Sequence, residues 1–312
     1  ATGSIAGTSA LAVVGIPDGN AVVYATQGAA GARGAVPTGI NHATSASVVR
    51  GAASIAIVGT GPGDGAGEHS LWSVPWQGAR GAGTPVRVAH LHPSDRVLDA
   101  VKVGAETLVL LARPDAYGET IGHTLAVARV PDRGVPAAQL AGRVGDPFAD
   151  PIGHGRGPAS LVVGAAARGA SPLYVAYAER ETVRYATLRG VELREPRSLS
   201  ETFPNGGSHL VFGDGDGAWR WAVLASGLPE DDAAPRGSGI TLLGFEALGT
   251  GLALAARTIT APDDAGAIAE SARVSARGRE ALLTYARVER DGTLSWMASR
   301  ASCALAQAGG AR

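Results

Sequence analysis

The sequence predicts an all-β chain that folds as a six-bladed β-propeller of four-stranded antiparallel blades. The first observation is a repeat: paired short apolar runs recur about every 50 to 60 residues, a period typical of propeller blades. The second is their form, because the runs are short, often alternate, and end in Gly, Pro, Asp or Asn, as strands and turns do. The third is the content of 45 glycines, which suit tight turns. Each would cost about 1 kcal/mol relative to Ala inside a helix.

Each repeat supplies four strands in the same order. The inner strand, rich in Ala, Ser, Gly and Val, is expected at 47–50, 98–103, 159–163, 209–212 and 272–275. The second strand is expected at 10–15, 54–59, 107–112, 173–178, 219–225 and 281–286. The third follows at 20–24, 69–72, 123–127, 181–185, 240–243 and 292–296. The fourth, more polar strand is expected at 35–37, 85–90, 139–144, 197–200, 255–259 and 302–305.

The small inner strands fit blades that converge on a common axis, because large side chains would collide there. One closed array of four to eight blades is a single body. We therefore expect a single domain over 1–312, with blades at 1–45, 46–95, 96–157, 158–207, 208–268 and 269–312.

One segment carries a resemblance to a known family. Leu71, Trp72 and Val74, then a turn at Gly78 and a basic strand over 85–88, resemble the third-to-fourth strand passage of TolB-like (PD40-type) propeller repeats. A weaker match covers 182–190 and 196–199. The resemblance implies a propeller that acts as a binding platform or as a gating domain attached to a peptidase.

Composition excludes several classes of partner. The formal net charge is −1 and the sequence pI is about 6.7, so nothing attracts a nucleic acid or an anionic membrane. No apolar run approaches the roughly 18 residues that span a bilayer. Cys303 is the single cysteine, so it is either a buried apolar residue or paired outside the chain. Because the chain starts at Ala1 without Met, we expect a processed N-terminus and a periplasmic, extracellular or cell-surface protein.

The candidate site is the face that surrounds the mouth of the central channel. There the loops between second and third strands meet the connectors between blades, and converging loops usually carry function. Long loops at 61–68, 113–122 and 227–239 hold carboxylates, among them Asp64, Glu68, Asp115, Glu119, Glu230, Asp231 and Asp232. Six of the seven histidines are assigned to this face, and His90 is not. The predicted binding set is His42, His69, His92, His123, His154, His209, Asp115, Tyr117 and Arg156.

A metal site is the alternative interpretation of these histidines. Neutral imidazole is a common ligand for Zn or Mn, and nearby carboxylates would complete the shell. His42, His92, His154 and His209 would then hold a divalent transition metal that promotes hydrolysis or β-elimination. However, histidines are also common in loops, and no ligand pair such as His-x-Glu-x-x-His supports a site. The main expectation therefore includes no cofactor.

Other motifs are more simply explained by structure. The run 213–217 lacks the ligand spacing of a calcium loop, and 61–65 lacks the Lys-Ser/Thr of a phosphate loop. Trp219 and Trp221 share a strand face, so packing between blades is the first interpretation and ligand stacking the second. No Gly-x-Ser-x-Gly motif occurs, although carboxylates that meet through space leave no spacing to read.

Two functions from different classes follow. The first is a non-catalytic binding or assembly module that engages a protein or a small polar ligand, because a clear scaffold lacks any catalytic motif. The alternative is a metal-assisted lyase or hydrolase at the channel mouth. Low charge and an Ala/Gly-rich surface also fit a subunit of a larger assembly.

Overall fold

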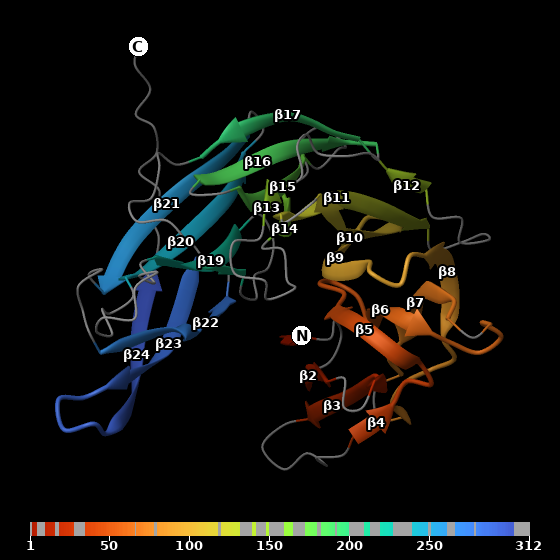
Figure 1. Cartoon of the computed structure of the whole chain (residues 1–312), viewed down its shortest axis with the longest axis horizontal. Coiled ribbons are helices and arrows are strands. Elements are labelled where there is room, and N and C mark those ends of the chain that lie inside the picture. Colours follow the sequence, from red (N-terminus) through yellow and green to blue (C-terminus); the bar gives the residue numbers. More distant parts are fainter. Residues whose placement is uncertain are drawn as a thin grey trace. The chain divides into compact units, whose positions relative to one another are not determined.

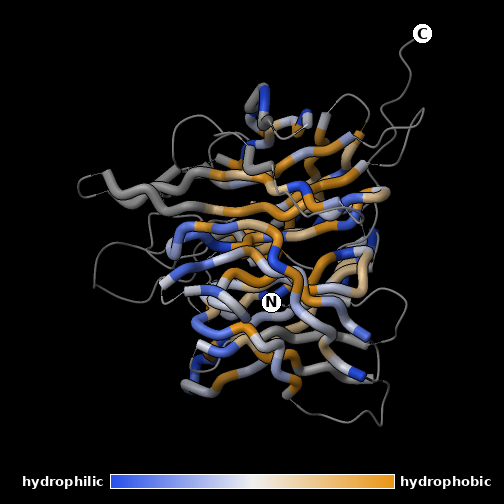
Figure 2. The backbone as a smooth tube through the Cα atoms, turned by 90° about the vertical axis from the view of Figure 1, so that its right-hand side faces the viewer, coloured by the Kyte–Doolittle hydropathy of each residue, from blue (hydrophilic) through white to orange (hydrophobic). Residues whose placement is uncertain are grey.

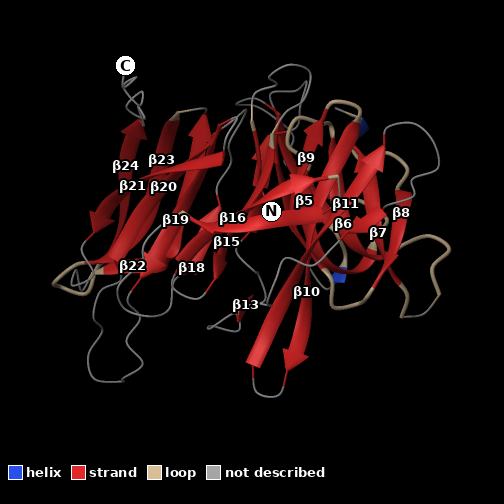
Figure 3. Ribbon diagram, turned by 90° about the horizontal axis from the view of Figure 1, so that it is seen from above, coloured by secondary structure: helices blue, strands red, loops and turns tan. Residues whose placement is uncertain are grey.

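The computed structural model is built from antiparallel β-sheets (Figure 3). It describes residues 2–4, 10–15, 19–27, 35–65, 67–77, 80–117, 120–131, 139–141, 148–149, 159–164, 172–179, 182–190, 192–199, 209–212, 219–226, 239–248, 251–260, 266–277 and 279–302. Within these ranges there is no α-helix. The search of the described residues for a helix long and apolar enough to cross a membrane found none. The all-β prediction is confirmed.

The described strands form six sheets that follow one another along the chain, labelled in Figure 1. The first contains β1 (Thr2–Ser4), β2 (Ala10–Gly15), β3 (Val22–Gln27) and β4 (Ala35–Pro37). The second contains β5 (Asn41–Val48), β6 (Ser54–Thr60), β7 (His69–Pro75) and β8 (Val86–Leu91). The third contains β9 (Arg96–Val103), β10 (Glu106–Tyr117), β11 (Thr120–Pro131), β12 (Gln139–Ala141) and β13 (Phe148–Ala149).

The later sheets repeat this order. The fourth contains β14 (Ala159–Val163), β15 (Leu173–Glu179), β16 (Thr182–Arg189) and β17 (Glu192–Ser198). The fifth contains β18 (His209–Phe212), β19 (Trp219–Ser226), β20 (Gly239–Leu248) and β21 (Gly251–Thr260). The sixth contains β22 (Ala267–Arg277), β23 (Glu280–Val288) and β24 (Leu294–Ser302). In each sheet neighbouring strands are consecutive in sequence, except that β13 of the third sheet pairs with β11.

The chain divides into two compact units. Unit 1 contains 1–161 and 186–196, and unit 2 contains 162–185 and 197–312. The division passes through the fourth sheet, whose strands contribute to both units. The single domain over 1–312 and its blade bounds stay predictions.

In unit 1 each sheet packs a face on the next. Ala21 and Val23 pack with Ile55, Ile57 and residues of β7. This packing joins the first sheet to the second. Opposite residues on the second sheet pack against Val97, Val109 and Leu111 of the third. The inner strands are neighbours too, because Arg50 at the end of β5 forms a parallel bridge with Val101 of β9. Hydrophobic segments lie along the strands while hydrophilic segments gather at their ends and turns (Figure 2).

Unit 2 is built in the same way. Tyr174, Tyr185 and Leu224 belong to one buried cluster between the fourth and fifth sheets. Trp219 and Trp221 stack with ring centroids 5.8 Å apart and pack against Leu283 and Tyr285 of the sixth sheet. The interpretation of these tryptophans as packing residues is therefore confirmed. A Cβ on Gly244, opposite Trp221, would lie 3.0 Å from the Trp219 ring, so a larger residue there would have to displace the ring slightly.

A buried charge links the inner strands of unit 1. Asp99 of β9 accepts hydrogen bonds from Arg50 at 2.8 Å, from the Ser160 hydroxyl at 2.5 Å and from the Leu161 N–H at 2.9 Å. The side chains of Arg50 and Asp99 are 14% and 4% exposed. Arg50 also donates to the Leu161 carbonyl at 2.6 Å, so the guanidinium that pairs with this carboxylate is itself held.

Four parts of the structure differ from the prediction. β1 supplies an inner strand to the first sheet, which the prediction lacked. The predicted loop 113–122 is mostly strand, because β10 and β11 stay paired to Tyr117 and Thr120 and extend beyond β9 (Figure 3). The strand predicted at 197–200 is β17, which begins at Glu192. Ser302 belongs to the third strand of the last sheet, and the rest of the predicted strand 302–305 lies outside the described residues.

The turn between β23 and β24 is closed by an aspartate. Asp291 Oδ1 accepts hydrogen bonds from the Thr293 hydroxyl at 2.6 Å and from its N–H at 3.0 Å. These bonds hold the pKa of Asp291 below its usual range. Gly292 between them has φ of 81°, a conformation that glycine adopts readily. The motif 291–296 therefore forms a hairpin turn.

Candidate functional site

The structure brings two of the predicted histidines together. His69, at the start of β7, places its Nε2 3.2 Å from the backbone carbonyl of His42. His42 has φ of 44°, which is uncommon outside glycine. The contact is to the main chain of His42, so it joins the starts of β5 and β7 without pairing the two imidazoles.

The other predicted residues lie apart from this contact or outside the described side chains. His92 starts a turn, since its N–H donates to Asp95 Oδ2 at 3.0 Å and its Nδ1 accepts from the Ser94 N–H at 3.2 Å. Asp115, Tyr117 and His123 lie on the paired strands β10 and β11, not in a loop. His209 starts β18. His154, Arg156, Glu119, Glu230, Asp231 and Asp232 lie outside the described residues. The binding role of this set stays a prediction.

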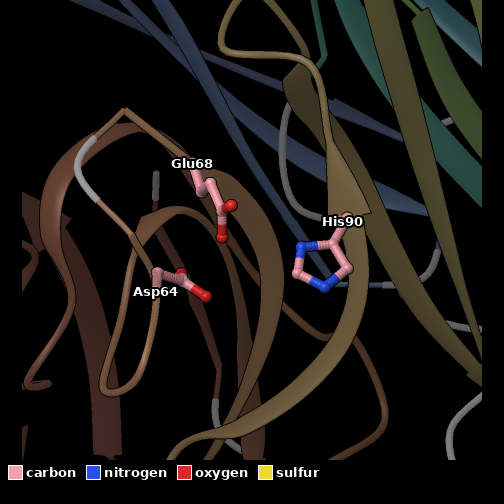
Figure 4. Close-up of side chains that lie close together, drawn as sticks. All are labelled: Asp64, Glu68 and His90. Atoms are coloured by element: carbon pink, nitrogen blue, oxygen red, sulfur yellow. The ribbon is translucent and has the colours of Figure 1, made fainter.

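A different group carries the candidate site, in the second sheet. Asp64 and Glu68 from the β6–β7 loop and His90 from β8 point toward one another (Figure 4). One potential ligand atom from each lies within 4.8 Å of the other two. In the part of the chain that the structure describes, this is the group of three that could hold a metal ion. It contains none of the four histidines predicted as ligands.

The loop fixes Asp64 before any ligand arrives. Its Oδ2 accepts the Gly61 N–H at 2.9 Å, and its side chain is fully shielded from solvent. Gly61 lies directly against the Trp72 indole, where a Cβ would overlap the ring. The Trp72 Nε1–H donates to the Gly59 carbonyl at 3.1 Å, so the buried indole supports the base of the loop.

An irregularity in β8 places His90 in the site. Ser70 pairs with His90 and Trp72 pairs with Arg87, with the register shift between Leu71 and Trp72. Ser70 and Trp72 lie on one face of β7, because alternate residues share a face. Arg87 and His90 therefore share that face although they are three residues apart, and Val88 is the extra residue of a β-bulge.

The hydrogen bonds of His90 orient its imidazole beside the two carboxylates. Arg87 Nη1 lies 3.3 Å from His90 Nε2, and Nδ1 lies 3.5 Å from the Ser70 hydroxyl. Since guanidinium can only donate, Nε2 accepts the bond from Arg87. The Ser70 hydroxyl in turn donates to Asp64 Oδ1 at 3.4 Å. Imidazoles that bind metals are oriented in this way by hydrogen bonds to neighbouring side chains.

Arg87 supplies the positive charge beside the two carboxylates. Its Nη2 lies 3.3 Å from Asp64 Oδ1. Its guanidinium lies over the Trp72 ring, 5.5 Å from the centroid. The 3.3 Å separation is longer than the usual 2.7–2.9 Å of a strong charged hydrogen bond. Arg87 therefore neutralises part of the cluster without closing it.

The ligand set suits a catalytic ion better than a structural one. One imidazole and two carboxylates match the preferences of Zn or Mn. Structural zinc sites are closed by four protein ligands, whereas catalytic sites keep a position open for water or substrate. Glu68 and His90 are exposed and Asp64 is partly buried, so an open position at such an ion would face solvent.

Sequence reasoning identified the two carboxylates but not His90. Asp64 and Glu68 stand in a loop that the glycine-rich sequence predicts. His90 was left out of the predicted histidine face, and the register shift at Val88 cannot be read from the sequence. The available signal was Arg87-x-x-His90 in a predicted strand, which places two polar residues on one face only if the strand bulges.

No family model and no characterised protein sequence matches the chain. Solved structures resemble it at low identity. An acylaminoacyl peptidase from Pyrococcus horikoshii is 11% identical with a TM-score of 0.43, over 95% of this chain and 43% of that one. The β-propeller domain of the Trilobed protease from Pyrococcus furiosus is 9% identical with a TM-score of 0.44, over 94% and 78%. A GH43_1 enzyme from Xanthomonas citri is 15% identical with a TM-score of 0.34, over 80% and 88%.

The chain spans less than half the length of the acylaminoacyl peptidase. These similar structures are mostly enzymes, so the expectation of a non-catalytic binding or assembly module is wrong. The physical reason is that side chains which meet through space leave no motif, as Asp64 and His90 do. With TM-scores below 0.5, these likenesses assign no activity or substrate to this chain.

Proposed function

We propose that this chain binds a divalent transition-metal ion through Asp64, Glu68 and His90 and uses it as a Lewis acid on a small polar substrate. The observation that carries the proposal is the approach of three ligand atoms to within 4.8 Å of one another. The ion would polarise a carbonyl or activate a bound water, which suits hydrolysis or β-elimination. The protein's part is to orient His90 through Ser70 and to hold Asp64 in its turn.

We also propose the finer architecture. The six sheets are six blades about one axis, built from TolB-like repeats. Their serial order, the packing of consecutive faces within each unit and the side-by-side inner strands β5 and β9 support this. A location outside the cytoplasm and a place in a larger assembly stay predictions, which cell fractionation and size measurement of the native protein would test.

Calorimetric titration with Zn²⁺ and with Mn²⁺ tests the metal site. We expect one equivalent to bind the wild-type chain. Asp64→Asn and His90→Gln should each weaken binding by more than tenfold, because each removes a ligand. Ser70→Ala should weaken it by about tenfold, since it releases the orientation of His90. The matched control is His92→Gln, which removes an exposed imidazole in the next turn and should leave the metal affinity unchanged.

Two results would contradict the proposal. Binding of less than about one-tenth equivalent by wild-type protein purified without chelator would exclude the site. Equal affinity in wild type and His90→Gln would place the ion elsewhere. Catalysis is then tested by turnover of a panel of esters, peptides and polysaccharides that is present with metal-loaded wild type and lost in Asp64→Asn. Metal binding without any such turnover would support the metal site and contradict the proposed catalytic activity.

A further inference from the structure

We infer that the metal-loaded site takes a substrate that carries a carboxylate, and that Arg87 is the residue that binds it. This inference rests on the proposed function. It starts from the charge of the site. Asp64, Glu68 and Arg87 together carry one negative charge, because the site holds two carboxylates and one guanidinium. A divalent ion changes this to one positive charge, so the loaded site attracts an anion.

Arg87 is in position to change partners. It shares the Asp64 Oδ1 oxygen with Ser70, at 3.3 and 3.4 Å. An ion bound to Asp64 takes over the neutralisation that Arg87 now supplies. The contact that holds the guanidinium on Asp64 is therefore weakened when the ion binds.

The freed guanidinium stays beside the ion. Arg87 belongs to β8, and its guanidinium lies over the Trp72 ring, 5.5 Å from the ring centroid. The Arg87 side chain is 34% exposed, so its remaining N–H groups can reach a molecule in solvent. Guanidinium presents its donors as a planar fork that matches a carboxylate. One carboxylate of the substrate would then lie on Arg87 while the neighbouring reactive group meets the ion.

Saturation-transfer NMR with benzoate and benzamide tests this inference. The two probes share a shape and differ in charge. Zn²⁺-loaded wild type should bind benzoate at least tenfold more tightly than it binds benzamide. It should also bind benzoate at least tenfold more tightly than the metal-free chain does. Arg87→Met should keep or increase metal affinity, because it removes the competing cation, and should lose benzoate binding by tenfold or more. Arg87→Lys should recover part of it, and Arg279→Met, an exposed arginine elsewhere, should match wild type.

The outcomes separate the two proposals. If metal binds and benzoate binds Arg87→Met as well as wild type, the ion alone attracts the anion and this inference fails while the proposed function stands. Equal binding of benzamide would overturn it in the same way. Tighter binding of inorganic phosphate than of benzoate would contradict a carboxylate substrate and indicate one that carries a phosphate. If wild type binds no metal, both proposals fail.

Discussion

Val88 determines which side chains meet at the candidate site. Because it is unmatched in the pairing of β7 with β8, Arg87 and His90 lie on the same face three residues apart. In a regular strand the face alternates at every residue, so His90 would share its face with Val88 and not with Arg87. A single inserted residue therefore assembles the arginine, the histidine and the loop carboxylates.

Gly61→Ala is predicted to damage both stability and metal binding. The new methyl group would overlap the Trp72 ring, and overpacking of this kind costs about 1–3 kcal/mol. The loop that carries Asp64 must shift, so metal affinity should fall as well. Urea unfolding and metal titration measure the two effects.

Gly104→Ala is the matched control. Gly104 has φ of 58° and open space around its Cα, so alanine there costs only the left-handed conformation, about 1–2 kcal/mol. Its metal affinity should equal that of wild type. Unchanged metal affinity in Gly61→Ala would show that the loop does not depend on its contact with Trp72.

At the residue scale, the sequence predicted the types of side chain in the candidate site better than their positions. Asp64 and Glu68 could be assigned to a loop because glycines surround them. His90 could not be assigned to the site, since strand register depends on long-range pairing and one slip changes the face of every later residue. The predicted histidine face depended on a regular register in every blade.

At the scale of elements, the inner strands are joined by Asp99. This carboxylate of β9 receives Arg50 from the end of β5 and two donors from β14. Asp99→Asn is predicted to lower the free energy of unfolding by about 3–5 kcal/mol, because it leaves the Arg50 charge buried without its partner. Urea denaturation followed by circular dichroism measures the change.

Glu106→Gln provides the comparison. It breaks an ion pair with Arg129 of similar length, 2.7 Å, but Glu106 is 40% exposed. Pairs exposed in this way contribute about 0–1 kcal/mol. Equal losses in the two variants would mean that burial does not set the strength of the Asp99 contacts.

The strands differ in how well their sequences mark them. The second strands contain dense apolar runs, such as Ile55–Val58 in β6, and apart from the far end of β10 they were predicted within a residue or two. β1 reads Thr-Gly-Ser and has no apolar residue, so only its pairing with β2 defines it. The β10–β11 hairpin extends through Pro114 and Asp115, residues that are depleted in strands and favour loops.

At the scale of the whole molecule, the sheets are joined in series within each unit. Each buried cluster contains residues of two consecutive sheets, as in arrays whose stability is a sum of nearest-neighbour terms. A cavity in one cluster should therefore loosen the two sheets that line it and spare distant ones.

Hydrogen exchange measured by mass spectrometry tests this. Trp221→Ala removes a buried ring and should cost about 3–5 kcal/mol. Exchange should rise in β18–β21 and β22–β24, which share its cluster, and stay at the wild-type level in β5–β8. Ile57→Ala should give the reverse pattern. A uniform rise over all six sheets in both variants would show one cooperative unit instead.

The five tryptophans divide by their surroundings. Trp72, Trp76, Trp219 and Trp221 are 2–7% exposed, whereas Trp296 on β24 is 69% exposed. An aqueous quencher such as iodide would therefore silence a single indole and leave the emission of four interior ones. One of those four lies under the Arg87 guanidinium, so the protein carries an intrinsic optical reporter at the place where its chemistry is proposed.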